Sequence, residues 1–187
     1  MHQRHNVPVP FVEPFYEPVM PGVKIELDGC LHHGHHKTFV VELLSGPHHV
    51  FHMSFRFAHH EHKLVMNSSV NGSWQCEERV HNPIGHHDSK FHLCVHVHAS
   101  HFDVHVNGRC VATFRHRYPI ETIQALGVHG DLHVDKLHFT GFPFRSAWGM
   151  PGYNWGHQGY MGYGTPQYVA PQFHPTHHHH HHWRKHY

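Results

Sequence analysis

Charged residues are scarce in this sequence. Lys and Arg total 14 and Asp and Glu 13, so charged side chains make up 14% of the 187 residues, against about 25% in an ordinary soluble domain. Histidine takes their place with 33 residues, and the net charge is +1 when histidine is neutral. Nucleic-acid-binding proteins usually carry a basic excess, so this balance argues against a nucleic-acid partner.

Long apolar runs are missing as well. No segment approaches the ~18 consecutive apolar residues of a membrane-spanning helix, so we expect no membrane insertion. The first five residues, MHQRH, are not followed by the apolar stretch of a secretory signal peptide. Composition therefore favours a soluble domain that does not use the classical export route.

The common cysteine motifs are also absent. No two of the four cysteines are spaced as C-x2-C, which excludes the usual zinc-knuckle and thioredoxin patterns. We expect free thiols, because disulfides are rare in proteins made in the cytosol.

Aliphatic and acidic residues almost disappear after Gly141. Residues 142–187 contain no Asp or Glu and, among Leu, Ile and Val, only Val169, but they hold three of the four tryptophans and five of the seven tyrosines. Such a segment buries too little aliphatic surface to offset the entropy of ordering it. We predict a flexible segment at 1–10, a domain at 11–141 and a disordered Gly/Tyr/Pro/His-rich tail at 142–187.

The domain shows strand periodicity and no convincing helix. Apolar and polar side chains alternate most clearly in three stretches, 50–57, 91–98 and 101–106. Turn dipeptides such as Asn107-Gly108 separate the short runs. This pattern predicts an all-β fold, either a sandwich or a barrel.

One hairpin can be paired from its sequence. A tight turn at Ala99 and Ser100 sets Val97 opposite Phe102. This register places every apolar side chain of residues 91–106 on one face, and a slip of one residue would reverse that.

The polar face of residues 50–57 is the first candidate site. His52, Ser54 and Arg56 share this face because side chains alternate along a strand. In most antiparallel sheets such a row only faces solvent. The next two predicted strands favour a binding site instead.

These two strands add further polar side chains. Residues 63–69 carry Asn67, and residues 75–80 carry Glu77 and Arg79 on one face.

The connection between them contains Trp74 and the turn dipeptide Asn71-Gly72. A strict two-residue turn would set Met66, a core residue, opposite the Glu77 carboxylate, so we expect a longer or bulged loop. Trp74 is expected at the entrance of the strand, where its ring can turn over the site.

Four segments together resemble a galectin carbohydrate-recognition domain: HMSFRF, VMNSSVNGSWQCEER, FDVHVNGRCVATFRHR and IQALGVHGDLHVDKLHF. The resemblance covers residues 11–140, and its most specific part is the W-x-x-E-x-R segment. It implies a two-sheet, antiparallel, jelly-roll-like sandwich that binds β-galactosides of glycoproteins or glycolipids on one sheet. It implies no metal, no cofactor and no catalysis.

Seven side chains form the predicted carbohydrate site: His52, Ser54, Arg56, Asn67, Trp74, Glu77 and Arg79. The indole of Trp74 offers a flat surface to the apolar face of galactose. His52 and Arg56 can hydrogen-bond the axial hydroxyl and the ring oxygen, and Asn67 and Glu77 the hydroxymethyl group. A shallow, wet groove of this kind predicts modest affinity.

Glu77 is not expected to act as a catalytic acid. A glycosidase needs two carboxyl groups that flank the scissile bond. Arg79 is expected to hold Glu77 ionised by a charge-assisted pair, so we predict that the protein is not an enzyme.

Three residues depart from the galectin pattern. Ser54 and Phe55 stand where the family has Asn and Pro, and Gln75 stands where it has Gly. A hydroxyl replaces an amide at the first position, so affinity and linkage preference are expected to differ.

Histidines outside this site leave a metal-binding alternative open. The 91–106 hairpin brings together three pairs of metal-ligating side chains: His98 with His101, His96 with Asp103, and Cys94 with His105. Such pairs can chelate Zn²⁺, Cu²⁺ or Ni²⁺. The alternative function is a His-rich metal-binding protein on the galectin scaffold with weakened or lost sugar binding. We prefer a solvent-exposed face without metal, because no closed set of four ligands can be read from the sequence.

Residues 177–182, six histidines, would bind nickel whether native or an expression tag.

Association and location follow from the resemblance. A homodimer, or self-association of the aromatic tail, would bring several sugar sites together and raise avidity. The resemblance is compatible with cytoplasmic residence and with extracellular release that needs no signal peptide.

Overall fold

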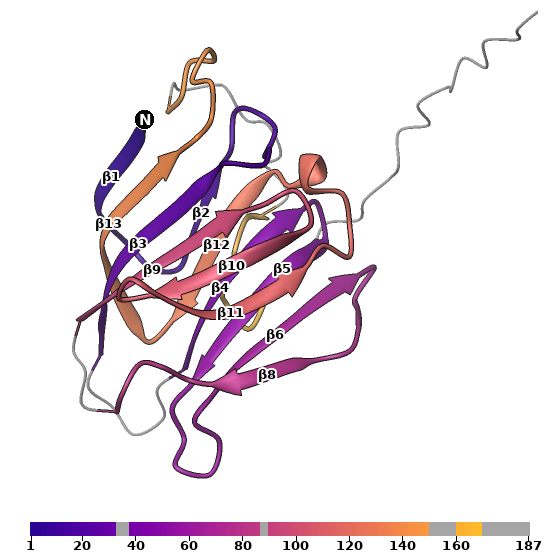
Figure 1. Cartoon of the computed structure of the whole chain (residues 1–187). Coiled ribbons are helices and arrows are strands. Elements are labelled where there is room, and N and C mark those ends of the chain that lie inside the picture. Colours follow the sequence, from indigo (N-terminus) through magenta and orange to yellow (C-terminus); the bar gives the residue numbers. More distant parts are fainter. Residues whose placement is uncertain (33–37, 87–89, 150–159, 170–187) are drawn as a thin grey trace, which may run out of the picture.

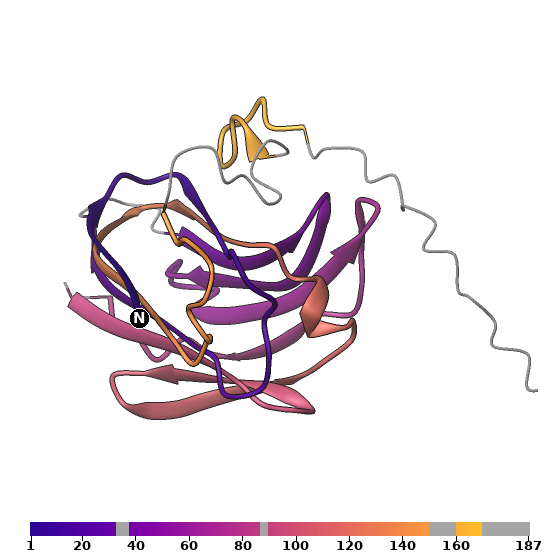
Figure 2. The same ribbon diagram turned by 90° about the horizontal axis from the view of Figure 1, so that it is seen from above.

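Two antiparallel β-sheets pack face to face (Figures 1 and 2). The structure, a computed structural model, describes residues 1–32, 38–86, 90–149 and 160–169. Within these residues the only helix is a single 3-10 turn, Ile120–Thr122, and no helix has the length and hydropathy to cross a bilayer. The predicted all-β, two-sheet antiparallel sandwich is confirmed.

The six-stranded sheet has the order β1-β13-β3-β9-β10-β11. Its strands are β1 (His2–Val7), β3 (Lys24–Leu31), β9 (Lys90–Val97), β10 (His101–Val106), β11 (Arg109–Arg115) and β13 (Leu132–Thr140). The seven-stranded sheet has the order β2-β12-β4-β5-β6-β7, and β8 also pairs with β6. Its strands are β2 (Phe11–Pro14), β4 (Thr38–Ser45), β5 (His48–Arg56), β6 (Lys63–Val70), β7 (Ser73–Trp74), β8 (Glu78–His81) and β12 (Ala125–Gly130).

The core between the sheets is rich in phenylalanine. Phe39 of β4 stacks on Phe91 of β9 with ring centroids 5.0 Å apart, and Phe51 of β5 stacks on Phe102 of β10 at 4.7 Å. All four side chains are buried. Each contributes roughly 1.5–3 kcal/mol by leaving water, so these pairs hold one sheet against the other.

The predicted β9–β10 hairpin is confirmed in its register. Phe102 pairs with Val97 and Val104 with Val95, and all four are buried. The polar residues between them therefore lie on the outer face of the six-stranded sheet.

The N-terminal residues differ from the prediction of a flexible segment. His2–Val7 forms β1, which pairs with β13 through a regular ladder. Glu13 of the opposite sheet accepts a hydrogen bond from Arg4 and lies 2.8 Å from His2 Nε2. Backbone pairing with β13 and the buried Glu13 carboxylate hold this polar strand in place. Its sequence lacks the apolar alternation from which a strand is predicted.

Parts of the C-terminal segment also pack on the sandwich. The ring of Phe142 is buried against Phe15, and Trp148 Nε1 donates a hydrogen bond of 2.7 Å to Glu17. Tyr160 and Tyr163 are buried on the seven-stranded sheet, above which residues 160–169 lie (Figure 2). Aromatic side chains therefore supply the buried area that aliphatic residues do not. The remainder of the predicted disordered tail, 150–159 and 170–187, lies outside the described residues.

Candidate functional site

Three adjacent strands place polar side chains in one row on the outer face of the seven-stranded sheet. His52 of β5 pairs with Glu42 of β4 on one side and with Asn67 of β6 on the other. Cross-strand neighbours on one face lie about 4.5–5.5 Å apart at Cβ, so the three side chains are in reach of one another. The β-ladder itself therefore assembles the centre of the site.

A tight turn and a bulge set the edge of the site. Asn71 and Gly72 form a two-residue turn with φ of 50° and 78°, the left-handed geometry of a type I′ hairpin. The turn is thus not lengthened, contrary to expectation. The extra residue lies beyond it, between β7 and β8, because Met66 pairs with Glu78 rather than Glu77. The predicted strand 75–80 is accordingly interrupted before Glu78.

An open cavity of about 280 Å³ lies over β5, β6 and β7. Its lining contains five of the seven predicted site residues together with Val65: His52, Arg56, Asn67, Trp74 and Glu77. Trp74 is 52% exposed although it is a large aromatic residue. Its ring stacks on His49 with centroids 5.2 Å apart and meets the edge of His52 at 4.7 Å. The indole is therefore fixed in orientation while about half of its surface stays open to a ligand.

The other two predicted residues support the lining from behind. Ser54 is buried, and its Oγ accepts a hydrogen bond of 3.2 Å from Arg56 Nε. Arg79 donates to Glu77 Oε2 from two nitrogens, at 2.9 and 2.7 Å. The predicted Arg79–Glu77 pair is thus present, and both residues act by positioning their neighbours.

Glu61 completes this network and was not predicted. Its Oε1 accepts hydrogen bonds from Arg56 at 2.8 Å and from Arg79 at 2.7 Å. Hydrogen bonds from Arg79 and Arg56 lower the pKa of the Glu61 carboxyl. Glu61 lies between strands, where side-chain alternation gives no signal.

His52 is held by a second unpredicted carboxylate, Glu42. His52 Nδ1 lies 2.6 Å from Glu42 Oε1, and Glu42 is only 2% exposed. Burial raises the pKa of Glu42, but the hydrogen bond and charge of His52, with smaller contributions from His49 and Tyr163, bring it below its usual value. In the neutral form of His52, the ionised carboxylate therefore keeps the proton on Nδ1 and leaves Nε2 as an acceptor.

Asn67 is fixed by its neighbours too. Its amide nitrogen donates 3.1 Å to the backbone oxygen of Gln75, and its oxygen accepts from Ser68 N and from Arg117. Arg117 also reaches the carboxylate of Glu78 at 3.0 Å. The contact between Arg117 and Asn67 could not be predicted from the local sequence pattern, because Arg117 follows β11 of the other sheet.

A second and larger cavity, of about 570 Å³, adjoins the first and shares His52 and Trp74 with it. The C-terminal segment builds one wall of this cavity with Tyr163, Gly164, Thr165, Pro166 and Tyr168. Tyr163 donates a hydrogen bond to Glu42, so this wall is tied to the residue that orients His52.

Comparison with known proteins finds a matching family. The sequence model of the family described as galactoside-binding lectin matches residues 10–139. The chain belongs to this family. It is similar to the probable galaptin lec-8 of Caenorhabditis elegans, with 45% identity over 95% of this chain and 97% of that protein. The probable galaptin lec-7 of the same organism is 34% identical over 79% of this lectin and 82% of its own length.

The fold of this lectin is also found among solved structures. The galectin LEC-6 of Caenorhabditis elegans superposes with a TM-score of 0.68 at 24% identity, covering 74% of this chain and 96% of LEC-6. At that identity the likeness bears on the fold only.

Proposed function

We propose that the 280 Å³ cavity binds the galactose of β-galactosides carried by glycoproteins or glycolipids. The observation that carries the proposal is a half-exposed indole beside a row of polar groups that are each held in place by a second residue. Glu42 holds His52, Glu61 holds Arg56, and Arg79 holds Glu77. Fixed polar groups lose little entropy when they bind a ligand, which favours recognition of one stereoisomer.

Each group suits one feature of galactose. The indole of Trp74 packs on the apolar face of the sugar ring. His52 Nε2 accepts a hydrogen bond from the axial hydroxyl, and Arg56 donates to the same oxygen and to the ring oxygen. An epimer with an equatorial hydroxyl would lose the hydrogen bonds to His52 Nε2 and Arg56, which costs about 1 kcal/mol for each bond. The site is therefore expected to reject glucose.

The hydroxymethyl group would lie toward the edge strand. Asn67 retains donor capacity, because an amide nitrogen has two protons and Gln75 O takes one. Glu77 offers a carboxylate in the same cavity lining. These two groups would fix the remaining free end of the galactose ring.

The neighbouring 570 Å³ cavity supports a preference for longer glycans. It opens from His52 and Trp74, so a second sugar linked to the galactose can enter it. Tyr163 and Tyr168 supply aromatic surface on its far wall.

Binding without catalysis fits the carboxylates of the site. A catalytic acid needs a raised pKa so that it keeps its proton near neutral pH. The pKa of Glu61 is instead lowered by Arg79 and Arg56, and Glu77 is paired with Arg79. Both carboxylates accept hydrogen bonds from arginine, the arrangement of a binding group rather than of a catalytic acid.

Cellular location and assembly are proposed on narrower grounds. All four cysteines are free thiols, as expected in a reducing compartment, which supports cytoplasmic residence with release that needs no signal peptide. Cross-linking of glycans would need a homodimer or self-association of the tail, in which Met161 and Val169 are strongly exposed. Sedimentation with and without lactose would measure the assembly directly.

Retention on lactose-agarose tests the site. Trp74→Ala and Arg56→Ala should abolish retention, because they remove the stacking surface and the donor to the axial hydroxyl. Arg109→Ala, which changes an exposed residue of β11, should leave retention intact. A folded Trp74→Ala protein that still elutes only with lactose would contradict the assignment.

A further inference from the structure

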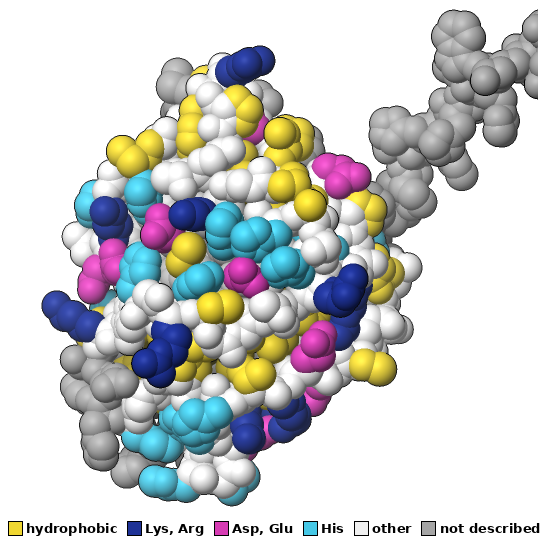
Figure 3. Space-filling view, in the orientation of Figure 1, with side chains coloured by type: hydrophobic (Ala, Val, Ile, Leu, Met, Phe, Trp, Pro, Cys, Tyr) yellow, Lys and Arg dark blue, Asp and Glu magenta, His cyan; other side chains and the backbone are white. Residues whose placement is uncertain are grey.

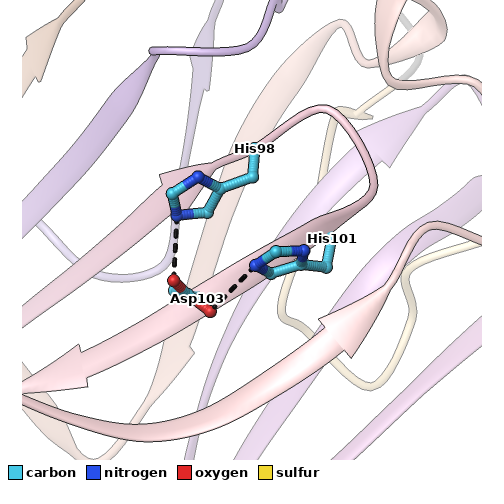
Figure 4. A group of neighbouring side chains, drawn as sticks. All are labelled: His98, His101 and Asp103. Carbon is cyan, nitrogen blue, oxygen red and sulfur yellow. Dashed lines mark ion pairs between the residues drawn. The ribbon is translucent and has the colours of Figure 1, made fainter.

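The turn between β9 and β10 gathers metal-ligating side chains far from the sugar site. His98 follows β9, and His101 and Asp103 belong to β10, with their side chains on the outer face of the six-stranded sheet. Figure 4 shows both imidazoles directed at the Asp103 carboxylate from the two sides of the turn. Figure 3 shows that histidines gather on this face with acidic side chains among them. The sugar site lies on the opposite sheet.

The separations between these atoms suit a shared ion. His98 Nε2 lies 2.8 Å from Asp103 Oδ2, and His101 Nε2 lies 3.3 Å from Asp103 Oδ1. One ligand atom from each residue lies within 4.8 Å of the other two. Two ligands of a tetrahedral zinc ion, with bonds of ~2.0–2.1 Å, stand about 3.3 Å apart. Small side-chain rotations would therefore bring the three groups around one ion.

The contact between His98 and Asp103 gives a second indication. His98 Nε2 is buried, and it forms an ion pair with Asp103 Oδ2 at 2.8 Å but no aligned hydrogen bond with any residue that the structure describes. Buried polar nitrogens normally have an aligned partner, so a small turn of this ring toward a cation shared with Asp103 gives up no hydrogen bond. The carbonyl of His98 lies 2.7 Å from His116 Nε2, a contact that restrains the backbone at this point.

The neighbouring side chains restrict the two rings. His101 Nδ1 lies 2.8 Å from Ser100 Oγ, which leaves Nε2 directed at Asp103. The His98 ring lies between those of His96 and His101, at centroid distances of 4.1 and 4.7 Å. Contacts of this kind orient metal-binding imidazoles in known sites.

We propose that His98, His101 and Asp103 form a binding site for a divalent transition metal, with Zn²⁺ as the ion that fits best. Two imidazoles and a carboxylate leave a fourth tetrahedral position for water. Mg²⁺ and Ca²⁺ are disfavoured because they take oxygen ligands. The site is additional to sugar binding and does not replace it.

A second set of ligands shares the same carboxylate. Ligand atoms of Asp103, His105 and Cys110 also lie within 4.8 Å of one another. The Cys110 thiol is exposed, whereas His98 and His101 are partly buried beside Asp103. We assign the ion to the two-histidine set, and Cys110 provides the means to test that choice.

Calorimetric titration of the full-length chain with ZnCl₂ tests the proposal. Every protein carries Gln in place of the histidines at 177–182, so that this run does not contribute. The parent should bind one zinc ion more than the His98→Gln/His101→Gln variant. Asp103→Asn, which keeps the side-chain shape, should weaken that one site at least tenfold. MgCl₂ should give no binding at this site.

Matched variants separate this site from other histidines. His5→Gln/His60→Gln removes two exposed imidazoles elsewhere and should retain the parent stoichiometry. Cys110→Ser should retain it as well. The proposal is overturned if the parent and His98→Gln/His101→Gln bind zinc equally, or if Cys110→Ser loses the site. Thermal unfolding without metal should be alike for all variants, and only proteins with the intact site should gain melting temperature when zinc is added.

Discussion

Glu42 contacts several residues around the candidate sugar site, although it does not line the 280 Å³ cavity. Its buried carboxylate contacts His52 at 2.6 Å and Tyr163, and lies 3.6 Å from His49. One side chain thus sets the tautomer of His52 and ties the C-terminal segment to the sheet. A buried charge is tolerated only with such partners.

Glu42→Gln should weaken lactose binding roughly tenfold, or about 1.4 kcal/mol, because the amide no longer enforces the Nδ1 proton of His52. It should also change the response to acid. The pKa of Glu42 is lowered in the folded protein, so its ionised form stabilises the fold above the unfolded value of 4.5. That contribution is lost as the pH falls through the lowered value. Urea unfolding between pH 7 and pH 3 should show a smaller acid-induced loss for the variant. If the free energy of unfolding fell equally with pH in both proteins, this role of Glu42 would be contradicted.

At the scale of elements, the turn between β6 and β7 determines where Trp74 stands. Asn71 and Gly72 adopt left-handed φ angles, and the same Asn-Gly turn joins β10 to β11, where Gly108 has φ of 80°. No atom lies within 4 Å of the position that a Cβ would take at either glycine. A substitution at either position would therefore strain the backbone without a clash.

Gly72→Ala and Gly108→Ala form a matched pair for this turn. Each should destabilise the fold by about 1 kcal/mol in urea, because alanine disfavours positive φ. Only Gly72→Ala should also weaken lactose binding, since β7 carries Trp74. Equal affinities for the two variants would show that the turn does not position the indole.

Alternation along the strands predicted an all-β fold, and the galectin resemblance narrowed that fold to a two-sheet sandwich. Alternation also predicted the β9–β10 register, because core burial leaves one pairing that hides every apolar side chain. Alternation placed His52 and Arg56 on one strand face, whereas Trp74 was expected at a strand entrance and the resemblance joined these residues into one site. Alternation could not reveal Glu42 or Arg117, whose roles depend on which strands become neighbours in three dimensions. It missed Glu61 because loop residues follow no period. It missed β1 because that strand is held by its backbone and by Glu13.

At the scale of the whole molecule, the C-terminal segment joins the binding face. Gly127 of β12 pairs with Glu42, and a Cβ at Gly127 would lie 2.5 Å from the Tyr163 ring. The missing side chain therefore makes room for Tyr163 to reach Glu42. Burial and the charge of Glu42 raise the pKa of the Tyr163 hydroxyl well above its usual value, so it remains a hydrogen-bond donor.

Gly127→Ala should displace this segment. The 280 Å³ cavity should stay unchanged, because no residue of the C-terminal segment lines it. Affinity for galactosides that carry a further sugar, lactose among them, should fall roughly tenfold, or about 1.4 kcal/mol. Affinity for methyl β-galactoside, which has no second sugar, should change much less, and chymotrypsin should cut faster at Tyr160 and Tyr163. If the effect acts through the Tyr163 ring, Gly127→Ala should add nothing in a Tyr163→Ala background. Additive losses in the double variant, or an equal loss for methyl β-galactoside, would mean that the segment is not a wall of the glycan site.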